Sequence, residues 1–399
     1  MTIRPFAALR PNASDAALVA SVPYDVVDLA EAKALAAGNP KSFLHVSRPE
    51  IDLPEGTDPS SSEAYAQARR ALDALAADGT MAEDPERRFY AYRQTMGSHS
   101  QTGIVATFDT KEYLSGAIRQ HERTRKDKED DRTRHIETLG AQTGPAFLTY
   151  RDDRAIDEIV FRACREAPLY DFTAPDGVGH TVWEIASASS CTADELQELF
   201  ARIPAMYIAD GHHRSAAAAR YAEAHGFEGE SRYFMAVAFP ASQLRILPYN
   251  RLVKSLNGLS KYEFMSALSE SFTIGSKGER NMRMYLDGAW TDVSWSLPAG
   301  AGPVDSLDVS YLQSNLLGPV LGIDDPRTSP RISFMGGIRG DAALAAKVDS
   351  GEAAVAFAME PVTVGEMMAI ADAGAIMPPK STWFEPKLRS GLFVHRVLR

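Results

Sequence analysis

One stretch near the middle of the chain joins an apolar run, a polar turn with a glycine and an alanine-rich segment. Residues 206–208 are apolar, residues 210–214 read Asp-Gly-His-His-Arg, and alanines fill residues 216–219. Because alanine is the strongest helix former, a strand, a tight turn and the start of a helix must follow one another closely here. This junction favours a fold in which strands and helices alternate.

The predicted turn is suited to holding an anion. The first backbone N–H groups of a helix have no partner inside the helix, and the helix dipole places partial positive charge there. Gly211 would let the backbone approach a ligand closely, and Arg214 would add side-chain donors beside the two histidines. The turn therefore predicts a phosphate site, although it is neither a Walker A loop nor a GxGxxG loop. A plain surface connection is the alternative.

Composition excludes several classes of protein. The 399 residues predict two domains, and the net formal charge of −11 argues against a surface for nucleic acid. The only cysteines, Cys164 and Cys191, form no CxxC motif; we expect buried side chains or a free thiol in a reducing compartment. Neither a signal peptide nor a membrane span is evident, so the expected location is the cytoplasm, with no membrane partner.

The remaining apolar patterns predict the other elements. Expected strands cover residues 3–9, 42–46, 89–93, 102–108, 146–150, 180–185, 233–239, 244–251, 283–287, 291–296 and 352–359. Expected helices cover residues 28–38, 63–78, 194–200, 261–271 and 308–321. Strands and helices alternate throughout, so the fold class is α/β or α+β. A boundary near residue 255 divides the chain into domains 1–255 and 256–399.

Two further segments stand out. Residues 119–135 carry charges of both signs, which is typical of a solvated helix face with internal salt bridges, although histidines and arginines without an apolar stripe can also line a phosphate site. Residues 377–387 lack the periodicity of a helix or a strand. This second segment could close over a site or pack as an irregular tail.

Taken together, these segments closely resemble the DUF-1015 family. The matching segments follow the family's order over nearly the whole chain, and they are residues 22–27, 39–50, 121–132, 209–214, 244–248 and 377–382. One departure is Asn250, which stands where the family usually has a histidine before Arg251, so a role for that histidine does not carry over.

The segment at residues 209–214 is also similar to a turn of the ParB/sulfiredoxin superfamily that holds nucleotide phosphates. This resemblance implies a mixed α/β (α+β) protein: a ParB/sulfiredoxin-like nucleotide-binding and catalytic core in residues 1–255 and an additional C-terminal α/β lobe that could close over the site. It also implies a small-molecule kinase that uses ATP or ADP with Mg²⁺, and free L-serine is the acceptor best supported by it. The expected partners are a nucleotide and a small-molecule substrate, with a homodimer as one option for the assembly.

Phosphoryl transfer needs charge neutralisation, positioning and a group that accepts the proton of the attacking hydroxyl. The candidate phosphate-binding residues are Asp210, Gly211, His212, His213, Arg214, Lys128, Arg132 and Lys380. The candidate catalytic residues are Glu122, His121, His212 and His213. A histidine of the turn would donate a hydrogen bond to an oxygen that gains charge in the transition state.

Two carboxylates have more than one possible role. Glu122 would act as the general base or as a ligand of Mg²⁺, which prefers oxygen ligands; a salt bridge to Arg123 or Arg125 is the purely structural alternative. Asp210 is the second candidate metal ligand, although an N-capping role is equally natural for an aspartate before a helix.

Four residues are candidates for substrate binding. Tyr24 and Asp25 could contact the ammonium group of an amino acid, or they could simply form a turn. His45 and Arg48 follow next, and arginine suits bidentate capture of a carboxylate. These residues would serve the free serine that the resemblance implies.

Other functions compete with the kinase. A ParB-type switch would bind nucleotide without phosphoryl transfer. A sulfiredoxin-like reductase would need a cysteine in the turn, where this chain has histidines. A zinc hydrolase would be expected to carry HExxH or a comparable cluster, and the sequence contains no such motif.

Overall fold

The computed structural model describes residues 1–398 and contains two compact units. The first unit consists of residues 1–244 and the C-terminal segment from Pro386 onward, and the second consists of Arg245–Glu385. The second unit is therefore an insertion in the sequence of the first. Compactness does not test which residues bind or catalyse, so the functional division at residue 255 stays a prediction.

A nine-stranded mixed sheet forms the centre of the first unit. Its strands, in spatial order, are β6 (Ile118–Arg119), β11 (Met206–Asp210), β8 (Ala146–Tyr150), β12 (Tyr233–Pro240), β5 (His99–Asp109), β4 (Arg88–Met96), β10 (Gly179–Ser187) and β9 (Tyr170–Thr173), with β1 (Ile3–Arg4) paired to β5. β12 runs parallel to β8 and antiparallel to β5. The long antiparallel pair β4–β5 confirms the strand pair predicted at residues 89–108.

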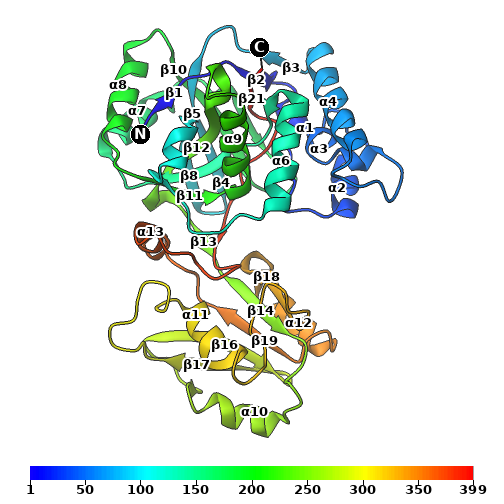
Figure 1. Ribbon diagram of the computed structural model, residues 1–399, viewed down its shortest axis with the longest axis vertical. Coiled ribbons are helices and arrows are strands. Elements are labelled where there is room, and N and C mark those ends of the chain that lie inside the picture. Colours follow the sequence, from blue (N-terminus) through cyan, green and yellow to red (C-terminus); the bar gives the residue numbers. More distant parts are fainter. Residues whose placement is uncertain (399) are drawn as a thin grey trace. The chain divides into compact units, whose positions relative to one another are not determined.

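Helices cover the sheet, and this burial explains why its central strands consist of apolar residues. All eight residues of β12 are buried, because a strand in the middle of a sheet that is covered on both faces has no side exposed to water. Figure 1 shows α6 (Lys126–Leu139) and α9 (His212–Ala224) side by side over the central strands. The other helices of this unit are α1 (Ala16–Val19), α2 (Leu29–Ala36), α3 (Leu44–Ser47), α4 (Ser62–Ala77), α5 (Thr110–Leu114), α7 (Arg154–Ala163) and α8 (Cys191–Ala201).

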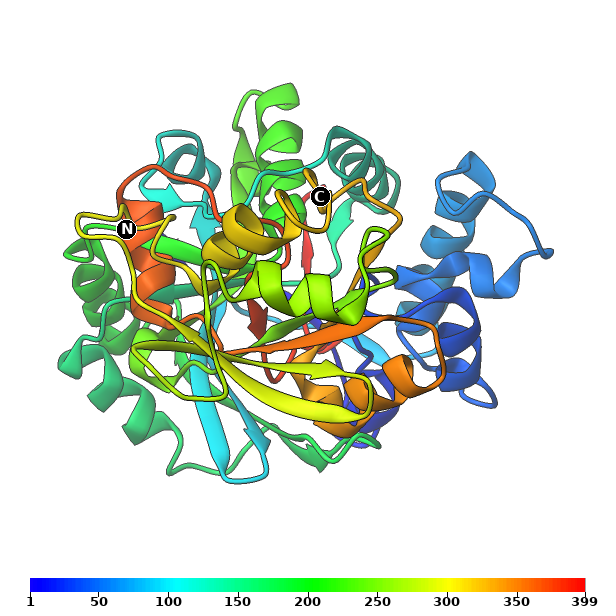
Figure 2. The ribbon, with the colours of Figure 1, turned by 90° about the horizontal axis from the view of Figure 1, so that it is seen from below.

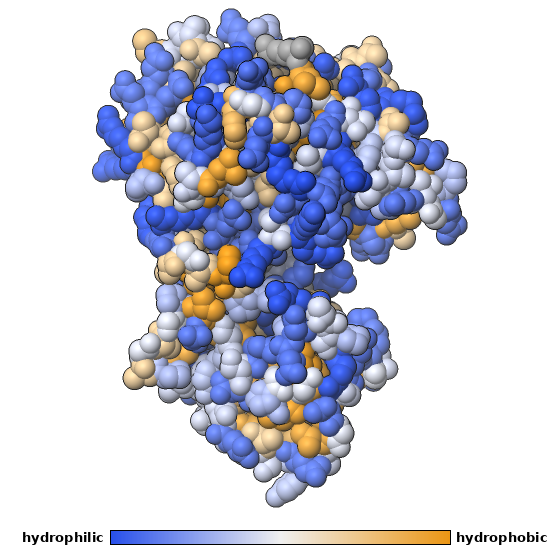
Figure 3. Space-filling model, in the orientation of Figure 1, coloured by the Kyte–Doolittle hydropathy of each residue, from blue (hydrophilic) through white to orange (hydrophobic). Residues whose placement is uncertain are grey.

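The charged run predicted at residues 119–135 folds mainly as α6. Its outer residues are exposed, and Figure 3 shows a hydrophilic surface over this helix. Its inner face buries Ile136 and Leu139, so the helix is amphipathic despite its charge. Figure 2 shows the blue helical group α2–α4 at one side of the sheet, and α4 packs against α6.

The C-terminal segment completes a second, four-stranded sheet of the first unit. Its order is β3 (Met81–Glu83), β2 (Ala8–Pro11), β21 (Val394–Arg396) and β7 (Ala141–Gln142). β21 thus lies between two strands from the first half of the chain. The short helical turn Gly229–Arg232 is fixed to it, because Nε2 of His395 lies 3.1 Å from Glu230.

The second unit has its own six-stranded sheet. The strands are β15 (Thr273–Ile274), β17 (Ala289–Trp295), β16 (Arg280–Leu286), β19 (Val355–Met359), β14 (Tyr249–Val253) and β18 (Ile332–Gly336), and a separate pair joins β13 (Ile246–Leu247) to β20 (Trp383–Phe384). The helices are α10 (Lys261–Leu268), α11 (Asp308–Leu312), α12 (Gly340–Asp349) and α13 (Val364–Asp372), and a π-helical turn at Gln313–Leu317 continues α11.

The mixed α/β class is confirmed, but one predicted strand is wrong. Residues 42–46 contribute to the buried helix α3 instead of a strand, because a short apolar run cannot by itself distinguish a strand from a buried helical turn. Cys191 is exposed and Cys164 is half-buried, so the expected burial of both is also wrong. Within residues 1–398, no helix is long and apolar enough to cross a membrane.

The contact between Glu230 and the C-terminal strand predicts an acid-sensitive stability. A hydrogen bond from His395, aided by Arg87, lowers the pKa of Glu230 to about 2 against the effect of burial. A carboxyl group with a lowered folded-state pKa stabilises the fold above its unfolded pKa, about 4.3, and this contribution is lost as the pH falls toward 2. Urea unfolding should therefore show a larger loss of stability from about pH 5 to pH 3 in the wild type than in Glu230→Gln.

The control for this experiment is Glu198→Gln, which replaces an exposed glutamate of α8. This variant should keep the acid sensitivity of the wild type. Equal acid sensitivity of Glu230→Gln and the wild type would contradict the prediction.

Candidate active site

The strand, turn and helix predicted at residues 206–225 are confirmed. β11 ends at Asp210, Gly211 is the N-cap residue, and α9 begins at His212. No side chain caps the helix, so the N-capping role considered for Asp210 is wrong. The carboxylate of Asp210 instead accepts a hydrogen bond of 3.1 Å from Nη2 of Arg214. The N-terminus of α9 thus keeps the backbone geometry that suits an anion.

Gly211 is required by both its backbone and its surroundings. Its φ of 88° lies in the left-handed region, which residues with a Cβ rarely adopt. A Cβ at this position would also lie 2.9 Å from Nε of Arg214. The absence of a side chain therefore allows the guanidinium to lie directly against the turn.

The Arg214 guanidinium is held on two sides. Nη1 donates a hydrogen bond of 2.6 Å to the carbonyl of Pro145, and Nη2 binds Asp210. Nε is buried and has no hydrogen-bond partner among the described residues. Burial lowers the pKa of this group, but Asp210 and Asp25 outweigh that effect and raise it. The side chain is thus a fixed cation with one unused donor.

Lys387 adds a second positive charge to the turn. Its ammonium lies 3.6 Å from the carboxylate of Asp210. Burial opposes ionisation of Asp210, yet Lys387 and Arg214 lower its pKa to about 2. Asp210 is therefore ionised and shared between two cations, which leaves it poorly suited to the metal-binding role predicted for it.

His121, Glu122 and His212 lie together beside the turn. The imidazole rings of the two histidines meet edge to face with centroids 4.6 Å apart. One potential ligand atom from each of the three residues lies within 4.8 Å of the others. Burial lowers the pKa of His121 to about 4 and that of His212 well below its ordinary value, so both rings are neutral at physiological pH.

His213 faces a different neighbourhood from His212. Its Nε2 accepts a hydrogen bond of 3.1 Å from the backbone N–H of Arg125, at the start of α6. Burial lowers its pKa, while the negative charge of Asp25 acts in the opposite direction. Asp25 is exposed, so the turn and the loop at residues 22–27 lie within electrostatic range of each other.

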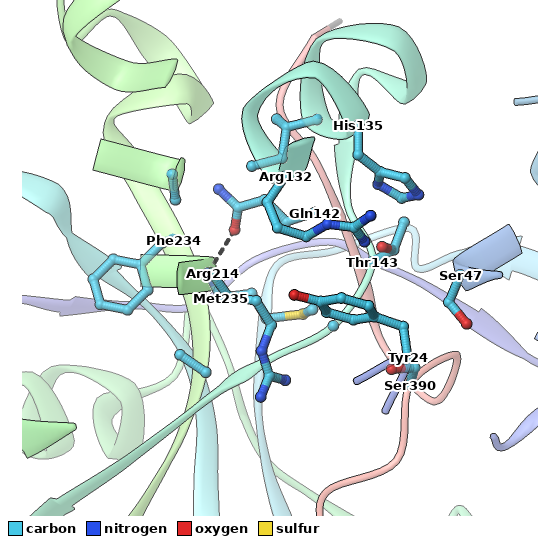
Figure 4. A pocket seen from close by; sticks show the side chains of 14 residues that line it. Tyr24, Ser47, Arg132, His135, Gln142, Thr143, Arg214, Phe234, Met235 and Ser390 are labelled. Carbon is cyan, nitrogen blue, oxygen red and sulfur yellow. Dashed lines mark hydrogen bonds between the residues drawn. The ribbon is translucent and has the colours of Figure 1, made fainter. Parts of the chain in front are cut away.

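A pocket opens beside Arg214 (Figure 4). Segments that are distant in sequence supply its polar lining. The polar lining residues are Tyr24, Ser47, Arg132, His135, Gln142, Thr143, Arg214 and Ser390. Ile136, Ala146, Ala218, Phe234 and Met235 supply apolar contacts. The mixture of an apolar wall with a few convergent polar groups is typical of a small-molecule site.

Tyr24 and Arg132 form one wall of the pocket. The guanidinium of Arg132 lies over the phenol ring, 4.1 Å from its centroid (Figure 4). Asp131 holds Arg132 through an ion pair of 2.6 Å and accepts a hydrogen bond of 2.7 Å from Tyr65. Burial raises the pKa of Tyr24 to about 12, so its hydroxyl stays protonated and can donate a hydrogen bond.

The other predicted substrate-binding residues have structural contacts. Arg48 donates hydrogen bonds to the carbonyls of Tyr24 (2.9 Å) and Val27 (2.6 Å) and pairs with Glu50. It thereby fixes the loop that carries Tyr24. His45 contacts Asp52 and the carbonyl of Asn39. Neither Arg48 nor His45 is among the residues that line the pocket.

The two lysines predicted to bind phosphate do not line this pocket. Lys128 is an exposed residue of α6 and does not line it. Lys380 belongs to the second unit, where its ammonium lies 5.2 Å from the ring centroid of Tyr249. Lys387, the last residue of the irregular segment 377–387, is the lysine that reaches Asp210.

Sequence reasoning missed several polar lining residues. Ser47, Gln142, Thr143 and Ser390 carry no motif that would have marked them. Oγ of Ser47 is buried without a hydrogen-bond partner in the described part of the chain. The only local signal was the family-like segment around Arg48, which contains Ser47.

Comparison with known families now identifies the class of the protein. Residues 3–310 match the family described as "Protein of unknown function (DUF1015)". The match covers more than half of the chain, so the protein belongs to this family, as the resemblance predicted. A comparison with curated protein sequences gives no match.

Several solved structures show a distant likeness. A free serine kinase in complex with AMP is 13% identical, with 72% of this chain and 91% of the kinase covered and a TM-score of 0.38. SbnI with a C-terminal truncation, from Staphylococcus aureus, is 12% identical, with 73% and 87% covered and a TM-score of 0.40. A conserved hypothetical protein from Pyrococcus furiosus is 13% identical, with 73% and 95% covered and a TM-score of 0.36. Likenesses of this size carry no argument about activity, and the ParB/sulfiredoxin-like character of the core stays a prediction.

Replacement of Gly211 should be costly for two separate reasons. In Gly211→Ala the backbone strain adds to the displacement of Arg214, which its two hydrogen bonds hold in place. We expect a loss of about 1–3 kcal/mol in the free energy of unfolding, measured by urea denaturation. The matched control is Gly38→Ala, where φ is 71° but a Cβ would meet nothing within 4 Å. A loss no larger than that of the control would contradict the close packing of Arg214 on the turn.

Proposed function

We propose that this protein is a nucleotide-dependent phosphotransferase that phosphorylates the hydroxyl group of a small metabolite. Free L-serine is the acceptor to test first, because the family resemblance points to it. The single observation that carries the proposal is the buried, unpartnered Nε of Arg214 at the N-terminus of α9. A buried donor on a fixed cation, beside free backbone N–H groups, is suited to a phosphate oxygen.

The charges around the turn support phosphate binding. Arg214 and Lys387 supply two cations, and Asp210 compensates only one of them. Arg132 contributes a third cation at the pocket, where Asp131 balances its charge. A phosphate group would place negative charge beside these cations. Mg²⁺ that accompanies a nucleotide would supply further positive charge for its phosphate groups.

The pocket offers recognition groups for the remainder of a substrate. The Tyr24 hydroxyl, the Thr143 hydroxyl and the Ser390 hydroxyl line it. Asp25 lies within electrostatic range of Arg214 and His213, and its exposed carboxylate could pair with the ammonium group of an amino acid. Glu122, close to the turn, would accept the proton of the attacking hydroxyl or bind a metal ion.

Arg214 gives the sharpest test of this proposal. Arg214→Lys keeps the positive charge but removes the fork of donors, so one oxygen contact is lost. Since a hydrogen bond to a charged group contributes about 1.5–3 kcal/mol, kcat/KM should fall by about 10- to 100-fold. Phosphoserine formation from L-serine with ATP or ADP and Mg²⁺, followed by phosphorus NMR, measures the effect.

The control is Arg154→Ala, which removes a highly exposed arginine of α7 that pairs with Glu158 of the same helix. This variant should keep full activity. Product formed equally by Arg214→Lys and the wild type would contradict the phosphate-binding role. Nucleotide binding without any phosphorylated product, over a panel of amino acids and polyols, would favour the non-catalytic switch, and no nucleotide binding would overturn the proposal.

A further inference from the structure

The three residues His121, Glu122 and His212 have the chemistry of a metal site. Their potential ligand atoms all lie within 4.8 Å of one another. Both histidines are almost fully buried, with exposed fractions of 2% and 5%, whereas Glu122 is exposed. A buried pair of imidazoles with an exposed carboxylate at its open side can enclose a cation and still admit it from solvent.

The His212 ring supplies an independent observation. Its Nε2 is buried and has no hydrogen-bond partner among the described residues. A buried polar atom without a partner is costly and requires an explanation. An imidazole nitrogen that carries no proton offers a lone pair, as a metal ligand must.

The surroundings of His121 fit the same role. Its ring hydrogen-bonds to the backbone carbonyl of Ile208, in β11. Histidines that bind metals almost always donate their second ring N–H to a carbonyl or a carboxylate, which fixes the ring orientation. The negative charge of Asp210 also acts on both histidines, and this charge favours a cation nearby.

The donor set selects the kind of metal. Mg²⁺ prefers oxygen ligands, whereas two imidazoles with one carboxylate suit Zn²⁺, Fe²⁺ and their first-row neighbours. We propose that His121, Glu122 and His212 bind a divalent transition-metal ion of this class, and not Mg²⁺. This inference goes beyond the proposed function, because the three side chains can bind a metal in the absence of nucleotide.

The geometry requires only a small closure. Ligand atoms about 2.1 Å from a tetrahedral zinc lie about 3.4 Å apart, compared with the limit of 4.8 Å here. Three protein ligands leave a fourth position open, as in catalytic zinc sites, and that position would lie beside the N-terminus of α9, where His212 is the first residue.

Cobalt provides a direct test without any activity assay. We expect the purified, chelator-treated chain to bind one Co²⁺ per molecule, with visible absorption from ligand-field transitions. An equal concentration of Zn²⁺ should displace the cobalt, whereas a large excess of Mg²⁺ should not. Since the titration contains no nucleotide, a negative kinase assay would leave its result intact.

Two variants assign the ligands. Glu122→Gln changes an exposed side chain and should weaken Co²⁺ binding by about tenfold or more, since even indirect contacts of a metal site are worth 10- to 100-fold in affinity. His212→Gln should abolish the visible absorption. The matched controls are Glu137→Gln, on the exposed face of α6, and His99→Gln, in β5, and both should bind Co²⁺ as the wild type does.

Three outcomes would overturn the inference. They are the absence of cobalt absorption in the wild type, displacement of cobalt by Mg²⁺ as readily as by Zn²⁺, and unchanged cobalt affinity in Glu122→Gln. Circular dichroism of each variant separates loss of the site from loss of the fold.

Discussion

The position of the Arg214 guanidinium determines the rest of the candidate site. The side chain lies back over its own turn, where Gly211 leaves room for it, and it binds the Pro145 carbonyl and the Asp210 carboxylate. These contacts join the end of β11, the start of α9 and the loop that precedes β8. A cation fixed by several hydrogen bonds loses little conformational freedom when a ligand binds. This preorganisation suits the anion that we propose for the site.

Two chemically different regions flank this arginine. Arg214 lines a pocket with an apolar wall and hydroxyl groups, whereas His212, two residues earlier, lies together with His121 and Glu122. The first residue of α9 and its third, His212 and Arg214, belong to these two regions respectively. Because successive residues at a helix start point in different directions, one turn of backbone can present a metal-binding side and a phosphate-binding side at the same time.

The sequence allowed prediction of those helices and strands that depend on the propensities and the apolar pattern of neighbouring residues. The junction at residues 206–225 follows from alanine propensity and from one glycine, and the strand pair at residues 89–108 follows from its apolar pattern. Residues 42–46 were mispredicted because their burial as a helix depends on contacts with distant segments, such as the hydrogen bond from Phe43 to Val19. The apolar pattern of a short segment contains no information about such long-range contacts.

The partners of individual side chains were also beyond the reach of the sequence. Arg48 was expected to bind a carboxylate ligand, but its donors satisfy backbone carbonyls of the Tyr24 loop. Lys387 and Ser390 reach the site only because the C-terminal segment crosses back to the first unit. Long-range placement of this kind depends on the whole fold, and not on the neighbours of each residue along the chain.

Because the chain is synthesised from its N-terminus, the return of the C-terminal segment to the first unit affects the order in which the two units can fold. Strand β21 is placed between β2 and β7, yet it is synthesised after both and after the whole inserted unit. Domains generally fold as units during synthesis, but this one cannot pair its inner strand until residues 394–396 have left the ribosome. The inserted unit can complete its own sheet earlier. A nascent chain would thus pass through a stage in which the inserted unit is folded and the candidate site still lacks Lys387, whose ammonium lies beside Asp210 in the complete fold.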